Sequence, residues 1–133
     1  SDSFYEKALE LDSNNVIVLN NYAYYLSLRK AKLLKAKRMS FKCNSLEPNN
    51  GTYQDTYAWI LYQNLEYSEA KKWILKALEN GGEKNAIIVE HYGDILYKLG
   101  ETKEAIKNWE KAKELGEGSI YLERKIQEKE LYE

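Results

Sequence analysis

The side chains most often used in catalysis are scarce in this chain of 133 residues, which has one histidine, His91, and one cysteine, Cys43. A thiol beside an imidazole could form a nucleophilic pair. The two counts exclude a two-histidine metal site, a zinc-protease helix motif and a histidine–cysteine cluster. No glycine-rich phosphate loop is present either. We therefore expect no catalytic residue, no cofactor and no metal, and we interpret His91 as a surface or helix-start residue.

The distribution of charged residues does not favour nucleic-acid binding, and the apolar runs are too short for a membrane-spanning helix. Twenty basic residues balance twenty-one acidic ones, for a formal net charge of -1, and no block of five or six like charges occurs. Binding to phosphates needs a clustered positive field, so no nucleic-acid partner is expected. The longest purely apolar runs, such as VIVL and AWIL, are far shorter than the roughly 20 residues that cross a bilayer. We expect no membrane insertion.

A small residue recurs at intervals of 35 residues, at Ala23, Ala58 and Gly93. Each is preceded by a tyrosine and followed three positions later by a leucine, so the three residues share one helical face. Two further columns of small residues have a period of 34 or 35: Ala36, Ala70 and Ala105, and Ala8, Cys43, Ala77 and Ala112. This repetition predicts stacked helical units, none of which can bury its apolar face alone. The cysteine is interpreted as a small packing residue.

Turn residues recur with the same period and divide the chain into helices. The segments LDSNN and LEPNN lie 35 residues apart, and glycines mark the later boundaries. Ser3 with Glu6 and Thr52 with Asp55 have the spacing of capping boxes, and Ser119 is predicted to open the last helix. Eight helices are expected, over residues 3–11, 15–28, 32–46, 52–64, 67–79, 85–99, 102–114 and 119–131.

The segment HYGDILYKLGETKEAIKNWEKAKEL resembles a tetratricopeptide repeat. The small and aromatic positions of that motif match Gly93, Ala105, Trp109 and Ala112, and Gly100 lies at its inter-helix turn. The second unit is similar through Tyr57, Ala58, Leu61, Tyr67, Ala70, Ile74 and Ala77, and the first through Tyr22, Ala23, Leu26, Ala36 and Pro48. The chain departs from the motif where a tryptophan is usual near the start of each first helix, since Leu19, Gln54 and Val89 stand there.

The resemblance implies an all-α, right-handed α-solenoid of antiparallel helix pairs. The expected organisation is a single domain with the second helix of a truncated repeat at 1–14, repeats at 15–50, 51–83 and 84–117, and a capping helix at 118–133. Residues 3–11 match only the second helix of a unit. We therefore interpret the chain as the C-terminal part of a longer bacterial repeat protein.

In this family the first helices of successive units line a concave groove, and the resemblance places nine residues there. They are Asn20, Tyr24 and Ser27; Asp55, Trp59 and Tyr62; and Glu90, Asp94 and Tyr97. Spacings of four and then three put each trio on one helical face. Aromatic rings bordered by carboxylates form a surface suited to partner contact. Packing of Tyr24 and Tyr97 between neighbouring units is the alternative for those two residues.

The resemblance also implies a non-catalytic adaptor that binds an extended peptide or a partner domain. Family members that clamp the carboxylate of a chaperone tail do so with lysine, arginine and asparagine, whereas this groove offers Asp55, Glu90 and Asp94. We therefore expect no such clamp and a preference for neutral or basic peptides. A structural spacer or self-association module, monomeric or weakly dimeric, remains an alternative. An RNA-binding pentatricopeptide-like protein is disfavoured because no basic stripe is present.

Overall fold

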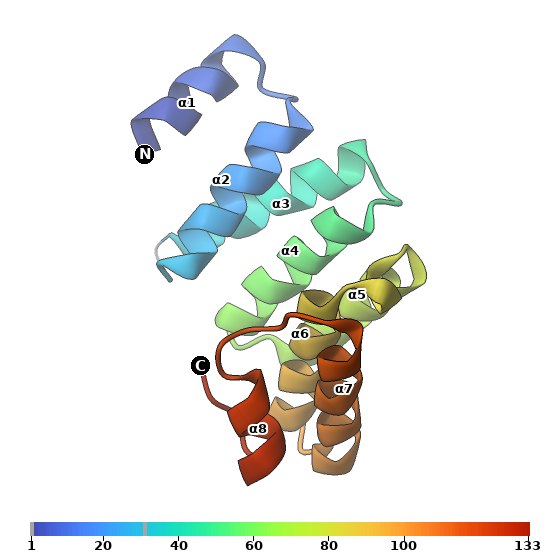
Figure 1. Cartoon of the computed structure of the whole chain (residues 1–133). Helices are drawn as coiled ribbons and strands as arrows, with labels where there is room; N and C mark the ends of the chain where they lie inside the picture. Colours follow the sequence, from blue (N-terminus) through green and yellow to red (C-terminus); the bar gives the residue numbers. More distant parts are fainter. Residues whose placement is uncertain (1, 31) are drawn as a thin grey trace.

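The computed structural model describes residues 2–30 and 32–133, and within them it contains eight α-helices, one short 3-10 helix and no strand (Figure 1). The all-α prediction is confirmed. The elements are α1 (Asp2–Leu11), α2 (Val16–Leu28), α3 (Leu33–Leu46), α4 (Gly51–Gln63), α5 (Tyr67–Glu79), η1 (Gly82–Lys84), α6 (Ala86–Lys98), α7 (Thr102–Leu115) and α8 (Leu122–Glu128).

Three helix hairpins, α2 with α3, α4 with α5 and α6 with α7, stack side by side along the molecule (Figure 1). The second helix of each hairpin packs against the first helix of the next, and α2 also contacts α4. The small residues of the 35-residue pattern are fully buried at the contacts, as Ala23, Ala58 and Ala105 show. A small side chain lets two helix backbones approach closely, and stacked hairpins then share a continuous core. The result is an α-solenoid.

Asparagines cap the first helix of each hairpin, and the capping boxes expected at Ser3 and Thr52 are wrong. Asn15, Asn50 and Asn85 precede the first helix of each hairpin, at intervals of 35 residues, and each side chain accepts a hydrogen bond from a backbone N–H of the first turn. Asparagine caps satisfy N–H groups that have no partner within the helix. Ser3 and Thr52 lie inside the helices that they were predicted to cap.

The contact inside each hairpin pairs a small residue with a larger one, and the two sizes compensate. Gly93 of α6 faces Trp109 of α7, and a Cβ atom added to the glycine would lie 2.5 Å from the indole ring. One repeat earlier the corresponding residues are an alanine, Ala58, and the smaller Ile74, which share one buried cluster. The glycine is therefore required by the volume of the tryptophan and not by backbone conformation.

We expect Gly93→Ala to lower the free energy of unfolding by about 1 to 2 kcal/mol, because overpacking outweighs the better helix propensity of alanine. Chemical denaturation measures this loss. The double variant Gly93→Ala, Trp109→Ile recreates the pair of the preceding repeat, so it should be more stable than the sum of the two single changes predicts. Strict additivity of the two losses would contradict this account of the contact.

The last helix is shorter than predicted, and Ser119 does not open it. Helix α8 spans Leu122–Glu128 and ends at Lys129, whose backbone is left-handed with φ of 55°. Ile120 and Tyr121 form a turn before the helix, and Ser119 makes hydrogen bonds to Glu90 of α6. We call residues 119–133 the C-terminal segment. In Figure 1 this segment, in red, lies on the same side as α6 and turns back towards α4.

Candidate functional site

The nine residues expected in the groove lie on α2, α4 and α6, but most of them are covered. Tyr24, Trp59 and Tyr97 keep part of their surface exposed, whereas the other six are buried: Asn20, Ser27, Asp55, Tyr62, Glu90 and Asp94. The C-terminal segment contacts three of these directly, as the hydrogen bonds of Tyr62, Glu90 and Asp94 show. The carboxylates therefore do not form the open acidic surface that the sequence suggested.

A cleft of about 280 Å³ lies between the groove and the C-terminal segment. One wall comes from α2, α4 and α6, and the other from the C-terminal segment. The first wall includes Leu28, Trp59, Ile87, Glu90, His91 and Asp94, and the second includes Ser119, Tyr121, Lys125, Tyr132 and Glu133. Trp59 and Asp94, expected on one surface, both line this cleft.

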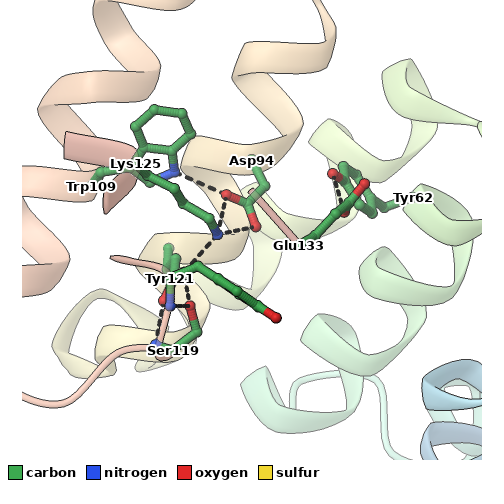
Figure 2. Close-up of polar contacts among 8 residues, drawn as sticks. Tyr62, Asp94, Trp109, Ser119, Tyr121, Lys125 and Glu133 are labelled. Atoms are coloured by element: carbon green, nitrogen blue, oxygen red, sulfur yellow. Dashed lines mark hydrogen bonds and ion pairs between the residues drawn. The ribbon is translucent and has the colours of Figure 1, made fainter. Parts of the chain in front are cut away.

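Lys125 is the centre of a buried ionic cluster between α6 and α8 (Figure 2). Its Nζ atom lies 2.6 Å from Oε2 of Glu90 and 2.9 and 3.0 Å from the two carboxylate oxygens of Asp94. Each of the three side chains is only 3% exposed. Trp109 Nε1 donates to Asp94 at 2.9 Å, and the Ser119 backbone N–H donates to Glu90 at 2.7 Å. Two buried carboxylates thus share one ammonium group.

The two carboxyl groups respond differently to this environment. Burial raises the pKa of Asp94 to about 6, because the ionised form loses its hydration, and Lys125 opposes the change only in part. Burial also acts to raise the pKa of Glu90, but hydrogen bonds from Lys125 and Ser119 outweigh it and leave that pKa lowered. Glu90 is therefore the firmly ionised partner of the lysine.

His91 connects α6 to α4 and is buried, which corrects its assignment as a surface or helix-start residue. Its Nδ1 atom lies 2.8 Å from Oδ1 of Asp55. The imidazole stacks on the Trp59 indole with centroids 3.9 Å apart, and this indole stacks in turn on Tyr62 at 4.5 Å. Two adjacent helices thus hold a column of three rings, and Asp55 anchors one end of it.

We expect the imidazole of His91 to titrate above the ordinary value of 6.5. Burial lowers its pKa, but the charge and hydrogen bond of Asp55 outweigh burial and raise it overall. Asp55→Asn keeps the shape and removes the charge, so it should lower this pKa. Because the chain has one histidine, a proton NMR titration follows a single imidazole. A raised His91 pKa stabilises the fold at acidic pH, and this contribution disappears as pH rises through the folded-state pKa. A midpoint unaffected by Asp55→Asn would contradict this pairing.

The end of the C-terminal segment reaches α4. The hydroxyl of Tyr62 donates to Glu133 Oε2 at 2.9 Å (Figure 2). Leu131 is partly buried and packs against the clusters of apolar side chains that include Tyr62 of α4 and Leu96 of α6. The segment therefore extends from α7 across α6 to α4, over two of the three helices that line the groove.

Among the described residues, no hydrogen bond or apolar cluster joins the α2 portion of the groove to the C-terminal segment. Tyr24 is 38% exposed, and Leu28, at the end of the same helix, is 58% exposed. Ser27 is fully buried and its hydroxyl donates to the backbone carbonyl of Tyr24 at 2.6 Å. The side-chain oxygen of Asn20 is buried and has no hydrogen-bond partner among the described residues.

Lys125 was not predicted, although the repeat period contains the signal for it. Asn20, Asp55 and Glu90 are spaced by 35 residues, and one further step of 35 leads to Lys125. Helix α8 therefore continues the column of first helices into the position of a fourth unit. The change from carboxylate to lysine at that step is what allows Glu90 and Lys125 to pair.

Two further observations on the described residues concern the reactivity of the cysteine and the possibility of a membrane-spanning helix. Cys43 is fully buried in α3, and burial raises the pKa of its thiol to about 11, so it is not a thiolate near neutral pH. Among the helices of the described part, none has the length and apolar character needed to cross a bilayer.

Comparisons with known proteins agree with this architecture. A family model described as tetratricopeptide repeat matches residues 4–38. No curated protein matches at a significant level of sequence similarity. Among solved structures, YrrB, described as a TPR protein with an unusual peptide-binding site, has a TM-score of 0.72 at 28% identity over 84% of this chain. The alignment spans 57% of the YrrB chain.

Two further structures share the fold at lower identity. MamA has a TM-score of 0.78 at 20% identity, over 94% of this chain and 72% of its own. The first TPR of Spaghetti (RPAP3), solved with the HSP90 peptide SRMEEVD, has a TM-score of 0.77 at 17% identity, over 89% of this chain and 92% of its own. The repeat period, the stacked hairpins and these matches together lead to one conclusion: the chain has the tetratricopeptide repeat fold, and the family model of that repeat matches its first helices.

Proposed function

We propose that this chain is a non-catalytic protein-interaction module that binds a peptide segment of a partner in the groove of α2, α4 and α6. The observation that carries the proposal is the cleft beside Trp59, in which a stacked aromatic column adjoins paired carboxylates. Clefts that combine apolar walls with a few polar groups are the usual form of ligand sites. The relative solved with a bound peptide has the same fold.

The rim of the cleft adds apolar surface that a partner could cover. Leu28, Ile87 and Tyr121 all line the cleft and are all exposed, Leu28 to 58%. Burying such side chains on binding stabilises a complex by about 25 cal/mol for each Å² of apolar surface removed from water. Trp59 belongs to the aromatic column and also lines the cleft, and a partly buried tryptophan in such a place is typical of an interface hot spot.

Peptide titration tests the proposal with the whole chain. A panel of lysine-containing, neutral and acidic peptides, with SRMEEVD among the acidic ones, is titrated while the indole resonance of Trp59 is followed by NMR. We expect lysine-containing or neutral peptides to bind and to shift that resonance. Trp59→Ala should weaken their binding about tenfold or more, which corresponds to about 1.4 kcal/mol.

Phe41→Ala is the matched control, because Phe41 is an exposed aromatic on α3 and does not line the cleft. The Phe41→Ala variant should bind each peptide with the same dissociation constant as the unmodified chain. Failure of every peptide to bind, or equal losses in the two variants, would overturn the assignment of the groove. Tight binding confined to the acidic peptides would overturn the preference for neutral or basic partners.

A further inference from the structure

We propose that the C-terminal segment is an internal ligand of the groove, and that the partner displacing it carries the same pattern: a leucine, a lysine three residues later and a leucine six residues after the lysine. In this chain the three residues are Leu122, Lys125 and Leu131. The inference rests on the peptide-binding function proposed above, and it adds the chemistry of the ligand and the way in which the site is closed.

The ionic cluster selects a lysine. Lys125 is the one charged side chain of the C-terminal segment that is buried, since the other six are exposed. Its ammonium group is within 3.0 Å of three carboxylate oxygens, one from Glu90 and two from Asp94. An apolar segment in the same place would leave both carboxylates buried and unpaired, which is strongly unfavourable. The groove therefore discriminates by charge as well as by shape.

Two leucines anchor the segment on either side of the lysine. Leu122 is buried in the cluster formed by Val89 and Leu96 of α6 with Trp109 of α7. Leu131 packs where the clusters of α4 and α6 meet, and beyond it Glu133 accepts the hydrogen bond from Tyr62. Just before the segment, the backbone of Gly118 lies close to α6. A Cβ atom added to this glycine would lie 2.7 Å from a carboxylate oxygen of Glu90.

The remaining contacts are too few to make the segment a permanent part of the core. Helix α8 has seven residues, well below the length at which an isolated helix is stable, and only Leu122 and Lys125 of it are buried. Ile120, just before the helix, is 88% exposed. A segment held by three anchors can exchange with a partner that supplies the same three.

Covalent attachment makes this internal ligand a strong competitor. A short flexible connection gives an effective concentration of about millimolar, so a free peptide must exceed it or bind better. The apparent affinity of a partner falls in proportion to the fraction of molecules in which the groove is open. Weakening the internal contacts should therefore raise the affinity for an added peptide with the same pattern.

The test uses the full chain and a fluorescent synthetic peptide of residues 119–133, with fluorescence anisotropy as the readout. Three chains are compared: the unmodified protein, Lys125→Met, and Lys129→Met as the matched control. Lys129 is exposed and lies in the same segment, so its replacement removes an equal charge without touching the groove. We expect Lys125→Met to bind the peptide at least about tenfold more tightly than the other two chains. A peptide with methionine in place of Lys125 should lose most of this gain.

Leu131→Ala provides a second way to open the groove that leaves the ionic cluster intact, and it should raise the affinity severalfold. Equal affinity of all chains for the peptide would overturn the inference. If panel peptides bind at Trp59 while no variant changes their affinity, the internal-ligand inference fails and the proposed function stands. If neither the panel nor the segment peptide binds any chain, the proposed function fails as well.

Discussion

Replacing Lys125 with methionine should reduce the stability of the C-terminal segment against detachment by about 3 to 5 kcal/mol, because the change leaves Glu90 and Asp94 buried without a cation. Native-state hydrogen exchange measures this at the Lys125 amide, which donates to the Tyr121 carbonyl at 2.9 Å. We expect the protection of α8 to be lost while α4 and α6 keep theirs. Lys129→Met should leave the exchange of α8 unchanged.

The loss should depend on pH with a definite sign. In the unmodified chain the pKa of Glu90 is lowered, so its contribution to stability is present above its ordinary pKa of 4.5 and is lost as pH falls through the lowered value. The raised pKa of Asp94, about 6, has the opposite effect, a cost at neutral pH that is relieved on acidification. Without the lysine both carboxyls take up protons more readily, so the difference between variant and parent should shrink in acid.

Removing the charges together provides the decisive control. In the triple variant Lys125→Met, Glu90→Gln, Asp94→Asn no ion is left unpaired, and most of the lost protection should return. Unchanged exchange of α8 in Lys125→Met, or a triple variant less protected than the single one, would contradict the role assigned to this cluster.

Trp109→Ala should lower the global free energy of unfolding by about 3 to 5 kcal/mol, the range for removing a large buried aromatic side chain. Trp109 is fully buried, fills the space beside Gly93 and donates to Asp94. Trp109→Phe separates these contributions, because it keeps most of the ring and removes the N–H group. This variant should lose about 1 to 3 kcal/mol, with the larger part from the hydrogen bond that the Asp94 carboxylate loses. Denaturant unfolding followed by circular dichroism measures both, and equal losses would contradict the packing role of the ring.

The helix pairs were predictable from the sequence because they depend on local periodicity. The spacing of Ala23, Ala58 and Gly93 reports where two helices approach closely, and a steric requirement of this kind repeats in every unit. Helices from α2 to α7 accordingly begin and end within about two residues of their predicted bounds, which is the usual uncertainty of helix ends. The caps differ from the prediction because residue type alone does not distinguish the asparagines Asn15, Asn50 and Asn85 from nearby serine or threonine, all of which can cap a helix.

The closed state of the groove was not predictable in the same way. Whether a lysine such as Lys125 is buried depends on carboxylates 31 and 35 residues away in the sequence, and nothing in the local pattern of α8 separates it from its exposed neighbours. The short length of α8 has a similar origin, since Ser119 forms hydrogen bonds with Glu90 instead of beginning a helix. Long-range polar contacts decide both features.

The most direct test of this account is whether the C-terminal segment lies in the groove of the unmodified chain in solution. Leu131 reports on it, because its methyl groups pack against the aromatic and aliphatic side chains of α4 and α6. Nuclear Overhauser effects between the Leu131 methyl protons and ring protons of Tyr62 or Trp59 are the predicted result. Leu131 methyl shifts of an unstructured peptide, with no such effects, would contradict it.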